Sequence, residues 1–298
     1  MVNNSKPSVQ ILMSTYNGEK YLGTQLDSLF NQKDVNVSLL VRDDGSSDNT
    51  TSIIEDYAKE NPIKLIRGNN KGYANSFWEL VQKAEDSDYY AFCDQDDFWC
   101  EDKLMAAIKM ISDKGNVPVL YTSNVDTVDD ALNLITHNAF PVTDVQNFNQ
   151  SLLTSILPGC TFVFNKELLP YLKQYKGLVI SHDWLVYIIA AGVGIVLFDD
   201  KPHIKYRIHG NNVLGIQSPI KKLKVQIHNF FYPKYPNGRS VVSRNIYESF
   251  GADLSEEDAK VARLFGYYKS QYRNIWSLLK YDEFRDFILD VLLLLKKA

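Results

Sequence analysis

Three carboxylates stand within four positions directly after an apolar run. The segment 89–92 predicts a buried strand, and Asp94, Asp96 and Asp97 follow it. Charges this close at the end of a core strand repel one another and lose hydration, so they are tolerated where a cation or several hydrogen-bond donors lie among them. Oxygen ligands on a short loop suit Mg²⁺ or Mn²⁺, which leave positions for a substrate phosphate. The motif therefore predicts a metal-diphosphate site, with a solvated turn that caps a helix as the alternative.

The composition narrows the class of protein that carries this motif. The chain has 298 residues and a net charge of -4, which disfavours a nucleic-acid binder that relies on a broad basic field. Its three cysteines form no Cys-x-x-Cys pair, which argues for a reducing compartment and against a zinc site. The polar segment 1–7 lacks the apolar core of a signal peptide, and no apolar run is long enough to span a bilayer. We expect a cytoplasmic protein that lies at the inner face of the cell membrane.

Elements that position the motif alternate along the first half of the chain. Apolar runs predict strands at 9–13, 35–41, 63–66, 89–92 and 119–121. Helical spacing predicts helices over 22–30, 53–57, 77–81 and 103–111. This alternation predicts an α/β fold with a mostly parallel central sheet flanked by helices. Because ligands bind at the carboxyl ends of such strands, the polar clusters that follow them are expected on one rim.

The second half of the chain is less periodic. The region 126–150 is predicted to be largely loop, and it is followed by strands at 160–164, 195–198 and 203–208 and by helices at 166–172 and 181–191. Beyond residue 218 the pattern is helical. We therefore expect a catalytic domain over 1–215, divided near 125 into a nucleotide-binding half and an acceptor-side half (126–215). A helical C-terminal extension is expected over 216–298.

Polar residues also follow the first two predicted strands. Thr15, Tyr16 and Asn17 stand at the end of the first strand, and Asp44 lies just beyond the second. An aromatic ring with hydroxyl and amide groups can stack on and hydrogen-bond a pyrimidine, and a carboxylate can accept from its N3–H. The alternative for each is turn chemistry, because Asn-Gly and Asp-Gly favour turns.

Four motifs occur in a fixed order over roughly residues 8–212. They are Thr15-Tyr-Asn-Gly, Asp43-Asp-Gly-Ser-Ser-Asp, Asn70-Lys-Gly and Asp94-Gln-Asp-Asp. In this order they resemble the inverting family 2 glycosyltransferases, which have the GT-A (nucleotide-diphosphosugar transferase) fold. The resemblance implies donor-nucleotide contacts from Thr15, Tyr16, Asn17, Glu19, Asp44 and Lys71. It also implies that Asp94 faces the ribose and that Asp96 holds a metal ion on the donor diphosphate.

His182-Asp183-Trp184 stands where this family places its catalytic base. The family usually has an acidic pair here, and His182 departs from that pattern, so the resemblance assigns the role to Asp183 alone. An inverting transfer needs one general base near the acceptor hydroxyl, on the side opposite the leaving diphosphate. The alternative role for Asp183 is an N-terminal helix cap.

The segment 206–212 resembles the Arg-x-His-Gly-x-Asn segment of rhamnosyltransferase-like members of the family. Arg207 is suited to neutralise a diphosphate, and a neutral His209 imidazole is a good Mn²⁺ ligand. A hydrogen-bonded surface histidine is the alternative. Gly159, in Pro158-Gly-Cys, either allows close approach of a sugar or makes a tight turn.

A basic and aromatic segment over 221–244 and an apolar one over 284–295 characterise the C-terminal region. Such segments can lie on an anionic membrane surface, and packing on the catalytic domain or on a second copy in a homodimer is the alternative.

The expected function follows from the resemblance. It is the metal-dependent transfer, with Mn²⁺ or Mg²⁺, of L-rhamnose from dTDP-rhamnose to a bacterial cell-surface polysaccharide precursor, as a glycan or lipid-linked glycan. A UDP-hexose-dependent transferase of the same family is the alternative, followed by a sugar nucleotidyltransferase or a non-catalytic nucleotide-sugar-binding module. No nucleic-acid partner is expected.

Overall fold

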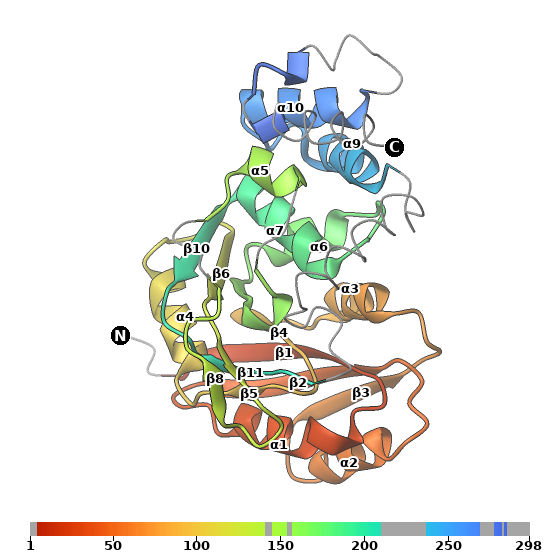
Figure 1. The fold of residues 1–298 in the computed structure, drawn as a ribbon, viewed down its shortest axis with the longest axis vertical. Helices are drawn as coiled ribbons and strands as arrows, with labels where there is room; N and C mark the ends of the chain where they lie inside the picture. The colour runs from red at the N-terminus through yellow and green to blue at the C-terminus, as the bar shows by residue number, and fades with distance from the viewer. Residues whose placement is uncertain are drawn as a thin grey trace.

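A central sheet organises the chain. The computed structural model describes residues 5–140, 145–153, 157–209, 237–268, 277–281 and 283–284. Within these residues the strands of a seven-stranded sheet lie in the order β10-β6-β9-β4-β1-β2-β3 (Figure 1). They are β1 (Ser8–Thr15), β2 (Asn36–Asp43), β3 (Ile63–Arg67), β4 (Tyr89–Cys93), β6 (Val119–Ser123), β9 (Val163–Asn165) and β10 (Ile195–Asp199).

Most of these strands pair in parallel, as predicted. β1 pairs in parallel with both β2 and β4, and β2 pairs in parallel with β3. β9 is the exception, because it runs antiparallel to β4 and β6. In the β1–β2 register Thr15 lies opposite Asp43, and in the β1–β4 register Met13 lies opposite Cys93. The loops that leave β1, β2 and β4 therefore start from one edge of the sheet.

Helices cover both faces of this sheet. They are α1 (Glu19–Phe30), α2 (Thr50–Tyr57), α3 (Tyr73–Lys83), α4 (Lys103–Ser112), α5 (Phe148–Leu153), α6 (Leu169–Gln174) and α7 (His182–Val193). Alternate residues of β1 point to opposite faces, as the two-residue period of a strand requires. Ile11 packs in the core that includes Leu26 of α1, whereas Leu12 packs in the core that includes Phe77 of α3. Helices α1, α2 and α4 thus cover one face, and α3, α6 and α7 cover the other.

A second, smaller sheet brings a distant segment to the acidic motif. Its strands β5 (Phe98–Trp99), β11 (Ile204–Arg207), β7 (Asp126–Val128) and β8 (Leu134–Thr136) lie in the order β5-β11-β7-β8. β7 and β8 lie in the region 126–150 and α5 begins there, but most of the described residues of this region lie outside helices and strands, as the prediction of a largely loop region has it. β11 runs antiparallel to β5, with Ile204 opposite Trp99. Since β5 directly follows the acidic loop, residues just beyond β11 end beside that loop.

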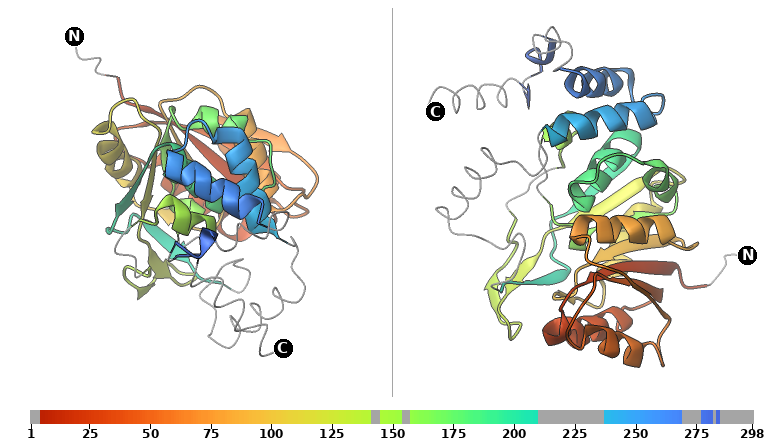
Figure 2. Two further views of the ribbon diagram at one scale, coloured as in Figure 1. Left: turned by 90° about the horizontal axis from the view of Figure 1, so that it is seen from above. Right: turned by 90° about the vertical axis from the view of Figure 1, so that its right-hand side faces the viewer.

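The described C-terminal part is helical, as predicted. α9 (Gly238–Phe250) and α10 (Glu256–Gly266) pack on one another, α9 contacts α7, and α10 contacts α5. They lie at the end of the molecule farthest from α1 and α2 (Figure 2). Ile246 and Phe265 are buried in the core that α6 and α7 also share. The apolar interior therefore extends from the sheet into α9 and α10, while the predicted boundary near 215 lies outside the described residues.

The segments considered for membrane contact lie mostly outside the described residues, which include none of 210–236 or 285–298. Phe284 is described, and its ring is fully buried 5.0 Å from that of Phe265. Among the described residues, no helix combines the length and apolarity needed to cross a membrane.

Candidate active site

A cavity of about 1080 Å³ opens at the carboxyl ends of β4, β1 and β2. Most of the predicted site residues line it, namely Thr15, Tyr16, Asn17, Asp44, Asp94, Asp96, Asp183 and His209. Residues from five separate segments of the chain therefore meet in one hollow, as the parallel sheet predicts. Glu19, Lys71 and Arg207 are not among the residues that line the cavity.

The loop after β1 is held in place by Asp43. This buried carboxylate accepts hydrogen bonds from the Thr15 hydroxyl at 3.1 Å and from the Ser46 backbone N–H at 2.9 Å. The Ser46 hydroxyl in turn accepts from the backbone N–H of Asn17, whose φ of 47° is in the left-handed region that asparagine tolerates. These bonds fix Tyr16 at the cavity, where its side chain is 48% exposed. Its ring is available for stacking on a base.

Asp44 organises the loop before α3. Its Oδ1 accepts from the backbone N–H of Lys71 and its Oδ2 from that of Gly72, both at 2.9 Å. The same carboxylate forms a buried ion pair with Arg42, which also binds Glu79 at 2.8 Å. The Lys71 ammonium pairs with Glu79 at 2.5 Å. Asp44 and Lys71 thus hold the loop before α3 in place beside the cavity, and their predicted contacts with the nucleotide stay predictions.

Two further predicted residues support the site from outside the cavity. Glu19 accepts hydrogen bonds from the backbone and side chain of Asn49, at 3.0 and 2.9 Å, and so links the start of α1 to that of α2. Arg207 is 2% exposed, and its Nε donates to the backbone carbonyl of Asp96 at 2.8 Å. Its guanidinium lies 4.6 Å from the centre of the Tyr21 ring. The described contacts of Arg207 hold the acidic loop, and its predicted contact with a diphosphate stays a prediction.

The acidic loop places its carboxylates in different surroundings. Asp96 Oδ2 lies 2.9 Å from His209 Nε2, and the His209 ring stacks on Tyr21 with 4.9 Å between centres. Burial, together with the charges of Asp96 and Asp183, raises the pKa of Asp94 to about 7. Asp97 is fully buried and accepts the backbone N–H of Arg207 at 3.1 Å. Its role is therefore to join the acidic loop to β11.

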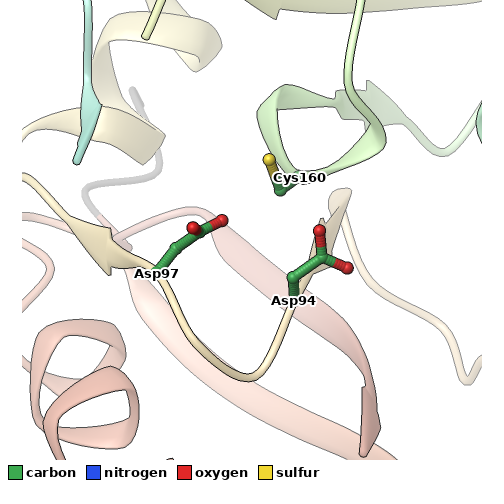
Figure 3. A group of neighbouring side chains, drawn as sticks. All are labelled: Asp94, Asp97 and Cys160. Atoms are coloured by element: carbon green, nitrogen blue, oxygen red, sulfur yellow. The ribbon is translucent and has the colours of Figure 1, made fainter. Parts of the chain in front are cut away.

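The Asp96–His209 pair fits a divalent cation. One carboxylate oxygen and one imidazole nitrogen face each other at the cavity, and Mn²⁺ accepts both ligand types. A second group of possible ligand atoms, from Asp94, Asp97 and Cys160, lies within 4.8 Å (Figure 3). Burial raises the pKa of the Cys160 thiol well above its usual value, so the protonated form is favoured there. The donor set of Asp96 and His209 therefore suits Mn²⁺ or Mg²⁺ better than this second group.

Asp183 lies in the first turn of α7 and lines the same cavity. Its carboxylate is 7% exposed and accepts hydrogen bonds at Oδ1 from the Ser181 hydroxyl and, at 2.7 Å, from the Trp184 backbone N–H. A Cβ on Gly159 would lie 2.9 Å from the Cβ of Asp183, so a side chain there would push against the start of α7. Asp183 is close enough to Asp94 for its charge to raise the pKa of Asp94. Asp183 lines the cavity as well as capping the start of α7, and its predicted role as catalytic base stays a prediction.

Several residues that line the cavity were not predicted from sequence, among them Gln95 and His182. Gln95, inside the acidic motif, binds the backbone of Tyr16, and nothing in their spacing along the chain signals this. His182 was noted only as a departure from an acidic pair, yet its ring lines the cavity and stacks on Phe77 with 4.0 Å between centres. The adjacency of His182 to Asp183 is the one sequence signal that could have identified it.

The chain is similar to known proteins in sequence. Residues 10–172 match the model of the family described as glycosyl transferase family 2. The dTDP-rhamnosyl transferase RfbG of Shigella flexneri is 34% identical over 229 residues, which cover 70% of this chain and 75% of that protein. The UDP-Glc:alpha-D-GlcNAc-diphosphoundecaprenol beta-1,3-glucosyltransferase WfgD of Escherichia coli is 33% identical over 113 residues, covering 38% of this chain and 44% of that protein.

Solved structures share the fold at low sequence identity. TarS residues 1–349 of S. aureus, in complex with UDP-GlcNAc, superpose with a TM-score of 0.56 at 16% identity, covering 88% of this chain and 87% of that chain. The mannosyltransferase PcManGT of Pyrobaculum calidifontis, in complex with GDP-Man and Mn²⁺, has a TM-score of 0.51 at 17% identity, covering 95% and 83%. The predicted GT-A fold is confirmed.

Proposed function

The chain belongs to glycosyl transferase family 2, and from this premise we propose that it transfers L-rhamnose from dTDP-rhamnose with inversion, aided by Mn²⁺ or Mg²⁺. The observation that supports this mechanism best is that Asp183, Asp94 and the Asp96–His209 pair line one cavity. The cavity, at about 1080 Å³, is large enough for a nucleotide sugar that contacts both the proposed metal ligands and the proposed catalytic base.

The residues of the cavity take separate parts in the proposed reaction. Tyr16 stacks on the base, and Asp94 binds the ribose. Asp183 accepts the proton of the acceptor hydroxyl as its oxygen bonds to the anomeric carbon, while the bond to the diphosphate breaks. A divalent cation held by Asp96 and His209 would supply positive charge that stabilises the leaving diphosphate.

The choice of dTDP-rhamnose as donor is supported by RfbG, whose name states that donor. A UDP-hexose is the second candidate, because WfgD is named for UDP-Glc and is 33% identical over the shorter stretch it shares with this chain. Both donors would use the same base, ribose and diphosphate subsites.

The proposed acceptor is a bacterial cell-surface polysaccharide precursor, as a glycan or lipid-linked glycan at the inner face of the cell membrane. The basic and aromatic segment 221–244 supports a position near an anionic surface. A second copy of the chain is the alternative partner for the helical C-terminal extension.

A donor panel tests the proposal. The purified chain, with Mn²⁺ or Mg²⁺ and lipid-linked acceptors, is expected to release nucleoside diphosphate from dTDP-rhamnose. Release from UDP-hexoses alone would replace the donor and keep the mechanism. Absence of release from every dTDP- and UDP-sugar would overturn the proposed function.

A further inference from the structure

The ring of His182 lies in an aromatic wall of the cavity. It is 5% exposed and stacks on Phe77, with 4.0 Å between centres and 15° between planes. The ring of Phe92 meets it edge-on at 5.1 Å, and that of Tyr73 does so at 6.1 Å. These ring contacts fix the plane of the imidazole, but none of them is a hydrogen bond to either of its nitrogens.

Neither ring nitrogen of His182 has a hydrogen-bond partner among the described residues. A buried polar atom without a partner lowers stability, so an apolar side chain would serve folding better at this position. The imidazole also lines the cavity. Its nitrogens are therefore placed to bind something other than this chain's own described side chains and backbone.

We propose that His182 determines donor specificity, with one ring nitrogen forming a hydrogen bond to a hydroxyl of the donor sugar. This inference rests on the proposed function, because it names a contact within the same site.

The surroundings of His182 favour a neutral hydroxyl over a phosphate. Burial lowers the pKa of His182 to about 4, against an opposing effect from Asp183, so the ring is neutral at pH 7 and carries one donor and one acceptor. The aromatic rings supply no positive charge, and the neighbouring Asp183 carboxylate repels an anion. A sugar hydroxyl, which both donates and accepts, matches this pair of nitrogens.

The packing of His182 favours the donor sugar over the acceptor. Phe77 belongs to α3, which follows the loop shaped by Asp44, and Phe92 belongs to β4, which leads into the acidic loop. β4 is a strand of the half of the sheet that carries the predicted nucleotide contacts, and α3 packs on that same half. The donor sugar must lie between the diphosphate subsite at Asp96 and the catalytic base at Asp183, and His182 is the neighbour of Asp183 in the wall of that cavity.

Paired titrations of the full chain separate the sugar from the nucleotide. Wild type, His182→Leu, His182→Phe and His182→Gln are titrated by calorimetry, in Mn²⁺, with dTDP, UDP, dTDP-rhamnose, UDP-glucose and UDP-GlcNAc. His182→Phe keeps the stack on Phe77, and His182→Gln restores a polar group. For the sugar donor that wild type prefers, Kd is expected to rise about 10-fold in the Leu and Phe variants and to recover partly in Gln. Kd for the free nucleotide is expected not to change.

A thermal scan distinguishes binding from folding. Tm of at least one apolar variant is expected to equal or exceed that of wild type, because the orphaned nitrogens are gone. The inference is overturned if an apolar variant binds the sugar donor as tightly as wild type. It is also overturned if Kd for the free nucleotide rises equally, or if acceptor KM alone changes. If wild type binds none of these sugar donors more tightly than the matching free nucleotide, this inference is overturned, whereas the proposed function is tested separately by the donor panel.

Discussion

Gln95 binds the backbone of Tyr16 through both ends of its side-chain amide. Its Oε1 accepts the Tyr16 N–H at 2.9 Å, and its Nε2 donates to the Tyr16 carbonyl at 3.1 Å. This pair of bonds joins the acidic loop after β4 to the loop after β1. A Cβ on the neighbouring Gly18 would lie 2.2 Å from Oε1, so glycine is needed for this approach. The position of the predicted nucleotide-base subsite at Tyr16 relative to the predicted metal subsite at Asp96 therefore depends on this contact.

Replacing Gln95 is expected to loosen the donor site. In Gln95→Ala both hydrogen bonds to Tyr16 are lost, so donor KM should rise about 10-fold and the free energy of unfolding should fall by about 1 to 2 kcal/mol. Gly18→Ala should act in the same direction, because its methyl group displaces the amide. Steady-state kinetics and urea unfolding measure both effects.

Gly23→Ala is the matched control within α1. The nearest atom to a Cβ at Gly23 is the Tyr57 hydroxyl at 3.8 Å, an ordinary contact. Alanine inside a helix should raise stability by up to about 1 kcal/mol and leave donor KM as in wild type. Equal losses of donor affinity in the Gly18 and Gly23 variants would contradict the account of this contact.

Glu79 is expected to make stability depend on pH. Lys71 first, then Lys83 and Arg42, lower its pKa from 4.5 to about 2 against the effect of burial. A carboxylate with a lowered folded-state pKa adds stability that is complete above pH 4.5 and is lost as pH falls toward 2. Glu79→Gln should therefore cost about 1 to 2 kcal/mol in the free energy of unfolding at pH 7. Urea unfolding between pH 7 and pH 3 should show the difference from wild type shrinking.

Glu55→Gln serves as the control for that series. Glu55 has one described ion-pair partner, Arg67, and both side chains are more than half exposed, at 56% and 55%. Such pairs contribute little and are screened by salt. The loss in the free energy of unfolding caused by Glu79→Gln could instead stay constant with pH, or be no larger than that caused by Glu55→Gln. Either result would contradict the stabilising charge network that links Glu79 through Arg42 to Asp44.

The Asp96–His209 pair predicts metal dependence. Chelation of divalent ions should abolish turnover, and Mn²⁺ should restore it. Asp96→Asn and His209→Ala should each lower kcat/KM by about 100-fold and require more Mn²⁺ for half-maximal rate. Rates measured across a Mn²⁺ titration check this.

His137→Ala controls for the loss of a histidine–carboxylate pair. His137 Nδ1 lies 2.7 Å from Asp126 Oδ1, but its side chain is 64% exposed and does not line the cavity. Its removal should leave the Mn²⁺ titration unchanged. If His209→Ala behaves like His137→Ala, His209 is not a metal ligand.

Much of the fold could be predicted because its elements are long and periodic. The alternation of strands and helices from β1 to α4 is local in sequence, and parallel pairing then brings Thr15, Asp43 and Asp94 to one edge. β7 and β8 were missed because strands of three residues carry too little periodicity. They are stabilised through β11, which lies far along the chain.

The sequence predicted which residue types belong to the site, but not the contacts that their side chains make. An arginine at the end of a strand has the same sequence signature whether its side chain binds a ligand or, like that of Arg207, binds the backbone carbonyl of Asp96. Gln95 binds the backbone of Tyr16, which every residue type has, so the sequence contains no pair of residue types that would indicate this contact. The stack of His182 on Phe77 joins α7 to α3 and depends on tertiary packing that local spacing does not encode.

Asp183→Asn, assayed for transfer and for donor binding in the same preparation, tests the central claim most directly. The amide keeps the size of the side chain and an oxygen that accepts from the Trp184 N–H, but it cannot take a proton from the acceptor. We expect kcat to fall at least about 1000-fold, while Kd for the sugar donor stays within about 3-fold of wild type. Transfer at a rate close to that of wild type would contradict the assignment of Asp183 as the base.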